Sequence, residues 1–342
     1  MAKAVRMADI AEKLGVSIVT VSKALNGKDG VGNSLRNKII ATAEEMGYES
    51  PQSKLTIDDT LSIGILNSYL YLQKGSSFYW SLYERLLKHL ASSDNLGILE
   101  VISQSAQTHC SIPKLVKSNR VDGLIVMGPF SDEYLKMLSL LKIPMVLLDS
   151  YSAKYDWDTV ISDGYYGMYV MTNHLIKQGH KNIAFVGTVG ETSSITDRFY
   201  GYCKAMTEAG IKVTENMIIP DRSDIGKIEL HLQPELIKNF TALACNCDYT
   251  AYEAMRLLTA QGVKVPDDIS IVGFDNYILS EITPVQITTY EVNQEKMAKI
   301  SVEQICERIR NPSKKREMDM INGNIIIRDS VKKIDTTSER TE

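Results

Sequence analysis

Short apolar runs recur along residues 61–275, separated by stretches in which the apolar residues have helical spacing. Continuous apolar runs of this kind are typical of strands in parallel sheets that helices cover on both faces. They are too numerous for one compact sheet in a chain of 342 residues, so the pattern predicts two lobes built from βαβ units. The predicted strands are 61–66, 97–102, 122–128, 144–149, 182–187, 241–246 and 270–275.

Residues 6–26 predict a separate helical unit ahead of the first strand. Their apolar residues recur at helical spacing around an interruption at Gly15, and the second helix is expected over 18–25. Ala11, Gly15 and Val21 have the spacing of a helix-turn-helix. In that motif a small residue lets the helices cross closely, a glycine takes the strained turn, and a branched residue holds the second helix on the first. A third predicted helix completes the unit.

The charge of the chain is unevenly distributed. Residues 1–40 hold seven Lys and Arg against three Asp and Glu, a net charge of +4, although the whole chain carries −4. The remaining residues therefore carry −8. A small basic unit on an acidic body is expected where one end of a protein meets phosphate and the rest does not.

The second helix of the basic unit is the predicted DNA-reading element. If it lies in the major groove, Ile18 and Val19 at its start face base edges, and they can contact only thymine methyl groups. The alternative is that they are core residues of an ordinary helical hairpin, but Val21 and Leu25 already fill the inward stripe. The predicted DNA contacts here are Ser17, Ile18, Val19, Thr20, Ser22, Lys23 and Asn26.

Three segments resemble a known family. DIAEKLGVSIVTVSKALNG, followed later by MGY, is similar to the DNA-binding head of the lactose-repressor (LacI/GalR) family of bacterial transcription regulators. VISDGYYGMYVMTNHLIKQGHKNIAFVG and VPDDISIVGFD are similar to signatures in the body of the same family. The resemblance thus extends over nearly the whole chain.

The resemblance implies an α/β protein with a three-helix helix-turn-helix head and a two-lobed, periplasmic-binding-protein-like body with parallel sheets. It implies a repressor of a carbohydrate-use operon, a homodimer on double-stranded operator DNA that is controlled by a sugar or related small molecule. The expected domains are a head over 1–49, a linker over 50–60, an effector-binding body over 61–331 and a polar tail over 332–342. The expected lobes of the body are about 61–161 with 291–320, and about 162–290 with 321–331.

The linker departs from the family pattern. Relatives usually carry a hinge helix there, whose leucine enters the minor groove, and Leu55 is the residue that stands in for it. Pro51, Asp58 and Asp59 do not favour a helix in so short a segment.

Charged and aromatic residues follow the predicted strands, where parallel sheets bind their ligands. Carboxylates and a guanidinium bind hydroxyls in pairs, and aromatic faces cover the apolar side of a sugar ring. A strand-end Asp is also often only a helix N-cap, an alternative that is equally favoured for Asp163. The family resemblance favours effector contact for Arg198, Asp248 and Asp275. The predicted effector residues are Phe78, Tyr79, Asp149, Asp163, Arg198, Asp248 and Asp275.

The sequence argues against other classes of protein. It lacks the phosphate-binding glycine motifs, the nucleophile elbow and the zinc-protease motif, so a doubly wound enzyme is not expected. Five cysteines without a Cys-x-x-Cys pair predict reduced thiols, and we expect no metal site and no cofactor. The N-terminus lacks the apolar core of a signal peptide and no run is long enough to cross a bilayer. We therefore expect a cytoplasmic protein with no membrane partner, which also disfavours an exported sugar-binding protein.

Overall fold

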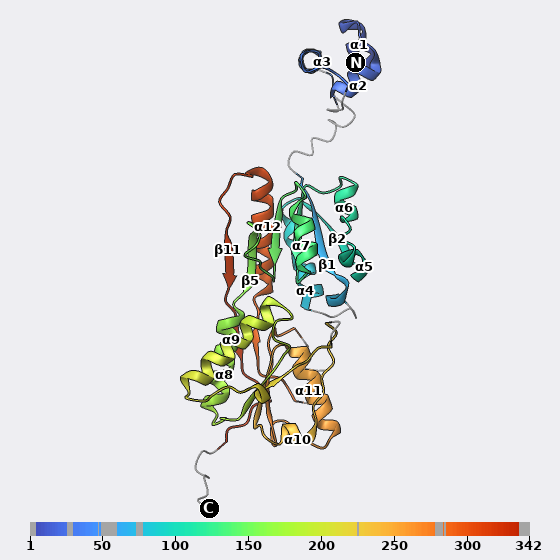
Figure 1. Ribbon diagram of the computed structural model, residues 1–342. Coiled ribbons are helices and arrows are strands. Elements are labelled where there is room, and N and C mark those ends of the chain that lie inside the picture. The colour runs from blue at the N-terminus through green and yellow to red at the C-terminus, as the bar shows by residue number, and fades with distance from the viewer. Residues whose placement is uncertain are drawn as a thin grey trace, which may run out of the picture. The chain divides into compact units, whose positions relative to one another are not determined.

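The computed structural model describes residues 5–25, 30–46, 48, 60–72, 78–223, 226–277, 283 and 285–334. Its contacts divide the chain into two compact units, Met1–Thr60 and Leu61–Glu342, which we call the head and the body. Figure 1 labels helices α1, α2 and α3 in the head and shows a layered α/β architecture in the body.

The head is a three-helix unit around a small apolar core. Ile10, Val21 and Ile39, one from each helix, are fully buried. Gly15 ends the first helix with a φ of 65°, a left-handed conformation that glycine adopts without steric cost. The predicted helix-turn-helix is therefore confirmed, with the second helix at the predicted residues. The helices are α1 (Met7–Leu14), α2 (Ile18–Leu25) and α3 (Asn33–Glu45).

The first lobe of the body contains a six-stranded sheet in the order β11-β5-β4-β3-β1-β2, with every pairing parallel. Helices α4 and α12 pack against each other and on this sheet. The strands are β1 (Ser62–Ser68), β2 (Leu96–Ile102), β3 (Gly123–Met127), β4 (Met145–Leu148), β5 (Asp158–Ser162) and β11 (Met318–Ile321). The helices are η1 (Tyr69–Tyr71), α4 (Phe78–Ser92), α5 (Gln104–Thr108), α6 (Lys114–Lys117), α7 (Asp132–Ser139) and α12 (Gln294–Arg310).

The second lobe contains a four-stranded parallel sheet in the order β7-β6-β8-β9 and an antiparallel pair, β10 with β12. Helices α8 and α9 cross closely at Gly201, where a Cβ atom would lie 2.1 Å from the Tyr165 carbonyl oxygen. The strands are β6 (Ile183–Val186), β7 (Ile218–Ile219), β8 (Ala242–Cys245), β9 (Ser270–Val272), β10 (Thr289–Glu291) and β12 (Asn324–Ile326). The helices are α8 (Gly164–Lys177), α9 (Ser193–Glu208), η2 (Glu215–Met217), α10 (Pro234–Ile237) and α11 (Asp248–Ala260).

The chain passes between the lobes after β5, after β10 and after β11. Each predicted apolar run contains or overlaps a strand, and the six-stranded and four-stranded sheets are parallel, as the sequence predicts. The five cysteines are free thiols. Among the described residues, no helix is long and apolar enough to cross a membrane.

Candidate DNA-binding surface and effector site

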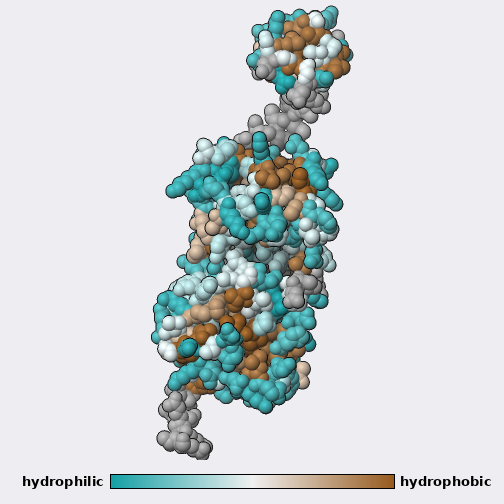
Figure 2. All heavy atoms as spheres, in the orientation of Figure 1, coloured by the Kyte–Doolittle hydropathy of each residue, from teal (hydrophilic) through white to brown (hydrophobic). Residues whose placement is uncertain are grey.

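The start of α2 presents apolar side chains to solvent. Ile18 is 53% exposed and Val19 is 64% exposed, whereas Val21 is fully buried in the head. Figure 2 shows hydrophobic side chains on the visible face of the head, and its exposed large hydrophobic residues are Ile18, Val19, Leu35 and Ile40. Ile18 and Val19 are therefore not part of the core of a helical hairpin, which leaves them available for contact with a partner.

The polar residues in and next to α2 differ from one another in hydrogen bonding and in exposure to solvent. The Ser17 hydroxyl accepts a bond from the Thr20 backbone N–H at 3.0 Å and lies 2.8 Å from the Thr20 hydroxyl, so Ser17, a predicted DNA contact, also caps α2. Lys23 is exposed and Ser22 is half-buried. Asn26 and Leu55, also predicted to contact DNA, lie outside the described residues, as does most of the linker.

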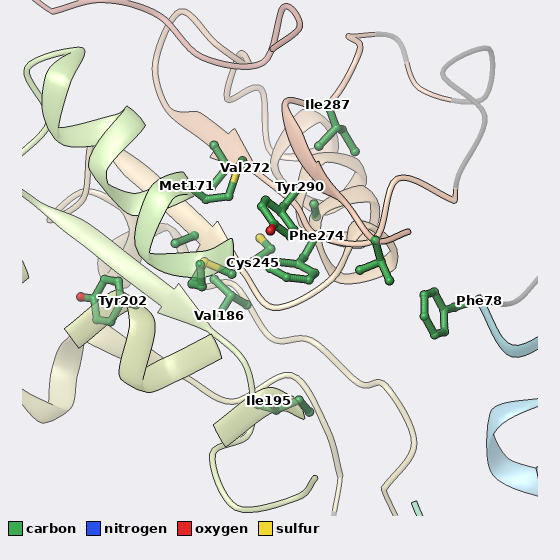
Figure 3. Close-up of a cluster of buried hydrophobic side chains, with 14 of the residues drawn as sticks. Phe78, Met171, Val186, Ile195, Tyr202, Cys245, Val272, Phe274, Ile287 and Tyr290 are labelled. Carbon is green, nitrogen blue, oxygen red and sulfur yellow. The ribbon is translucent and has the colours of Figure 1, made fainter. Parts of the chain in front are cut away.

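A buried ion pair lies in the second lobe where it meets the first. Arg198, in α9, donates to the Asp275 carboxylate at 2.9 Å and to the Asn246 carbonyl at 2.7 Å. Its guanidinium lies 3.9 Å from the centre of the Phe274 ring, and in the described part of the chain its Nε has no hydrogen-bond partner. Figure 3 shows Phe274 inside the buried cluster of this lobe, whereas Phe78 stands apart on a segment of the first lobe. The stacked and bonded arginine is held in one orientation.

Tyr79 and Asp149 of the first lobe lie near the Arg198–Asp275 ion pair. The Tyr79 phenol donates to the Asp149 carboxylate at 2.7 Å, and Asp149 directly follows β4 with a φ of 59°. The Phe78 ring lies 6.4 Å from the ring of Tyr277 in the second lobe. We call Tyr79, Asp149, Arg198 and Asp275 the interlobe cluster.

Burial raises the pKa of both carboxyl groups in this cluster. Burial raises the pKa of Asp149, and the charge of Arg198 partly opposes that rise. Burial also raises the pKa of Asp275, with Arg198 opposing it and the negative charges of Asp248 and Asp149 adding to it. Carboxylates accept hydrogen bonds from hydroxyl groups, which suits a ligand that carries hydroxyls.

Asp163 and Asp248 have structural partners. Asp163 is the N-cap of α8, where its carboxylate accepts a bond from the Tyr166 N–H at 2.9 Å. Asp248 is 3% exposed, and it accepts a bond from the Thr289 hydroxyl at 2.6 Å. Burial raises the pKa of Asp248 to about 7. The structure thus brings Tyr79, Asp149, Arg198 and Asp275 together and gives these two residues positions in the supporting framework.

Other residues at the lobe junction were not predicted. Tyr151 of the first lobe donates to Asp197 of the second at 2.8 Å, and Arg222 follows the two-residue strand β7. A strand of two residues has no apolar run that a sequence pattern could detect. Among the described residues, no group of three or more His, Cys, Asp or Glu side chains is arranged to hold a metal ion.

Two domain families match the chain. Residues 6–51 match the family described as bacterial regulatory proteins, lacI family, and residues 172–331 match the periplasmic binding protein-like domain. The first contains α1, α2 and α3, and the second contains most of the second lobe together with α12 and β11.

Proteins that match nearly the whole chain are also transcription regulators. The HTH-type transcriptional repressor PurR of Photobacterium profundum is 29% identical over 330 residues, which cover 95% of this chain and 98% of that protein. The structure of a complex of the transcriptional regulator CelR with cellobiose has a TM-score of 0.69 at 20% identity, covering 95% of this chain and 99% of that one. The lac repressor dimer bound to operator and the anti-inducer ONPF has a TM-score of 0.64 at 22% identity, covering 96% and 100%. With a helix-turn-helix head, both domain matches and a relative aligned along nearly its whole length, the chain belongs to the lacI family of bacterial regulatory proteins.

Proposed function

We propose that this regulator is a repressor that binds operator DNA as a homodimer, and that a polyhydroxylated effector bound at the interlobe cluster sets its DNA affinity. The observation that carries the proposal is the cluster itself, because two residues come from each lobe. A ligand that bonds to both lobes has a different affinity for each lobe arrangement, and only such a difference can shift an equilibrium between them. This is a binding function, and the family is one of regulators rather than enzymes.

The DNA-binding part rests on the head. An exposed pair of apolar residues at the start of α2 suits contact with thymine methyl groups, and the exposed Lys23 suits a phosphate. A relative in this family is named a transcriptional repressor, and the lac repressor forms a dimer on its operator. Two heads related by a two-fold axis would bind inverted half-sites about one helical turn apart.

The effector part rests on hydrogen-bonding capacity at the lobe junction. Arg198, Asp149 and Asp275 would bind hydroxyls, and Phe78 and Tyr79 would cover a ring face. Asp163 and Asp248 would hold the surrounding helices and loops in place. A regulator of similar fold binds cellobiose, which supports a sugar as the effector class. Because operator DNA is the target, we expect the protein to act in the cytoplasm.

The test begins with selection of binding sites from random double-stranded DNA by the full chain. A selected sequence with two inverted half-sites, protected as one footprint by a dimer, supports the DNA-binding part. A single asymmetric half-site bound by a monomer would contradict it. Pentoses, hexoses and disaccharides are then titrated against the complex with fluorescent operator, and a compound that shifts the operator affinity identifies the effector class.

A further inference from the structure

The side chain of Arg222 carries a buried positive charge with incomplete bonding. It is 10% exposed, and its Nε has no hydrogen-bond partner among the residues that the structure describes. Its Nη1 reaches the Gly226 carbonyl at 3.4 Å, a long contact for a charged donor. Asp221 lies 3.6 Å from Nε, beyond hydrogen-bonding distance. A guanidinium has five N–H donors, and in the described structure the Nε–H of this one is free while its Nη1 makes only a long contact.

Asp221 is occupied by other donors. Its Oδ1 accepts a bond from the Thr188 N–H at 2.9 Å, and its Oδ2 accepts bonds from the Asn246 amide at 2.6 Å and the Thr250 hydroxyl at 2.7 Å. Asp221 is fully buried, so this network holds it in place. The Asp221 carboxylate therefore balances part of the positive charge of Arg222 but accepts no hydrogen bond from its guanidinium.

Arg222 and the interlobe cluster have a common neighbour in Tyr71. Burial raises the pKa of Tyr71 in the first lobe, and the nearby charge of Arg222 opposes that rise. The Tyr71 ring is 5.7 Å from the ring of Tyr79. Arg222 also interacts electrostatically with Cys247, the N-cap of the 13-residue helix α11. The N-terminus of a helix carries a partial positive charge, which adds to that of the guanidinium.

The backbone fixes Arg222 in this position. Its N–H donates to the Thr188 hydroxyl at 3.0 Å, and the residue pairs with Ile228 in an antiparallel bridge. Glu191 is the other carboxylate near the guanidinium, but it is exposed and no ion pair within 4 Å joins it to Arg222 in the described part of the chain.

We propose that Arg222 binds an anionic group of the effector, so that the effector is a polyhydroxylated compound carrying a phosphate or a carboxylate. This assignment rests on the proposed function, since it places one end of the same ligand. Arg198 and the carboxyls of the interlobe cluster would bind the hydroxyls, while Arg222 and the N-terminus of α11 would bind the anion. Arginine matches both anions, because its planar fork can donate two parallel hydrogen bonds.

The test uses matched sets of compounds with the full-length protein. Ribose, glucose and fructose are each compared with a phosphate ester and a sugar acid of the same skeleton, by calorimetric titration and by release or tightening of the operator complex. We expect at least one phosphate or acid to bind about 10- to 100-fold more tightly than its neutral parent, the range expected for a charged hydrogen-bonded pair. The phosphate and acid arms show which anion the site takes.

Three variants test whether the preference for the anion depends on Arg222. Arg222→Gln keeps a polar side chain but removes the charge, and should reduce the preference for the anion to less than about twofold while the neutral parent still binds. Arg222→Lys keeps the charge and should retain part of the preference. Arg256→Gln is the matched control, because Arg256 lies on the outer part of α11 and bonds to Glu253, so it should bind like wild type.

The outcomes separate this assignment from the proposed function. If a neutral sugar binds most tightly, and equally to wild type and Arg222→Gln, the anion assignment is overturned while the effector site stands. If no compound in the sets binds at millimolar concentration, both the effector site and the assignment are overturned, while operator binding remains a separate measurement.

Discussion

Arg198 and Asp275 are bonded to each other at 2.9 Å in the interior of the second lobe, where their side chains are 6% and 7% exposed. The pair stabilises the lobe, and in the proposed effector site a ligand would meet charged groups that also satisfy one another. Removing one partner of a buried ion pair leaves the other charge unpaired in a medium of low dielectric constant. Loss of effector binding in a variant of either residue must for this reason be separated from loss of stability.

The first prediction concerns that pair. Arg198→Met should lower the free energy of unfolding of the body by about 3 kcal/mol, and Asp275→Asn should cost less in the Arg198→Met background than in wild type. Urea unfolding followed by tryptophan fluorescence measures this for the body alone, because both tryptophans, Trp80 and Trp157, lie there. Strictly additive costs would show that the two side chains do not interact.

The second prediction concerns pH. Burial raises the pKa of Asp248 to about 7, above its ordinary value of 3.8, so the folded body binds this proton more tightly than the unfolded chain does. The stability contributed by the protonated form is complete below about pH 4 and is lost as the pH rises to about 7. In Asp248→Asn, the fall in stability between pH 5 and 7 should be shallower by up to about 1.4 kcal/mol per pH unit. Parallel stability curves for wild type and variant would contradict the assignment.

The third prediction concerns base reading by Val19, which is 64% exposed. Replacing thymine with uracil in each operator half-site removes only a methyl group, and should weaken wild-type binding by about 0.8 kcal/mol for each methyl contacted. Val19→Ala should bind less tightly and be less sensitive to one of these replacements. Fluorescence anisotropy with single-replacement operators measures the effect, and equal sensitivity of both proteins at every position would remove Val19 from the groove.

The fourth prediction concerns phosphate contact by Lys23. Lys23→Ala should weaken operator binding and reduce the slope of log affinity against log salt by about 1. Lys13→Ala is a matched control, because Lys13 lies on α1 and faces Glu45 at 3.6 Å. Gel shifts across a salt series compare the two, and an unchanged slope in Lys23→Ala would place this lysine away from the phosphates.

The sequence predicted most elements of the fold because each lobe depends on continuous apolar strands, which give a strong local signal. The strands absent from that prediction are β5, of five buried residues, β7, of two residues, and β10, β11 and β12, each of three or four residues late in the chain. β11 is an edge strand in which Met318 and Met320 are both 54% exposed, so its residues do not form a buried run.

At the candidate site, motif and strand-end position identified the charged residues but not their partners. The strand-end rule placed Asp149 and Asp275 correctly at their sheets, yet it could not distinguish them from Asp163, which caps a helix. Hydrogen bonds such as Tyr79 to Asp149 join residues 70 positions apart, and only the packed lobes define them. No sequence pattern around Arg222 identifies it as a site residue. Its guanidinium is buried with an unbonded Nε only in the folded lobe.

The order of strands has a consequence for the newly made protein. The head is complete within the first 60 residues, whereas the sheet of the first lobe needs β11, whose Met318 pairs with Thr159 of β5. At translation rates of about 5 to 20 residues per second, the head emerges roughly 10 to 50 seconds before the last strand of that lobe. During this interval the nascent chain carries every residue of the head without a complete sensor. Control by the effector is thus acquired only at the end of synthesis, and a chain that stops before β11 would keep the head while losing its regulation.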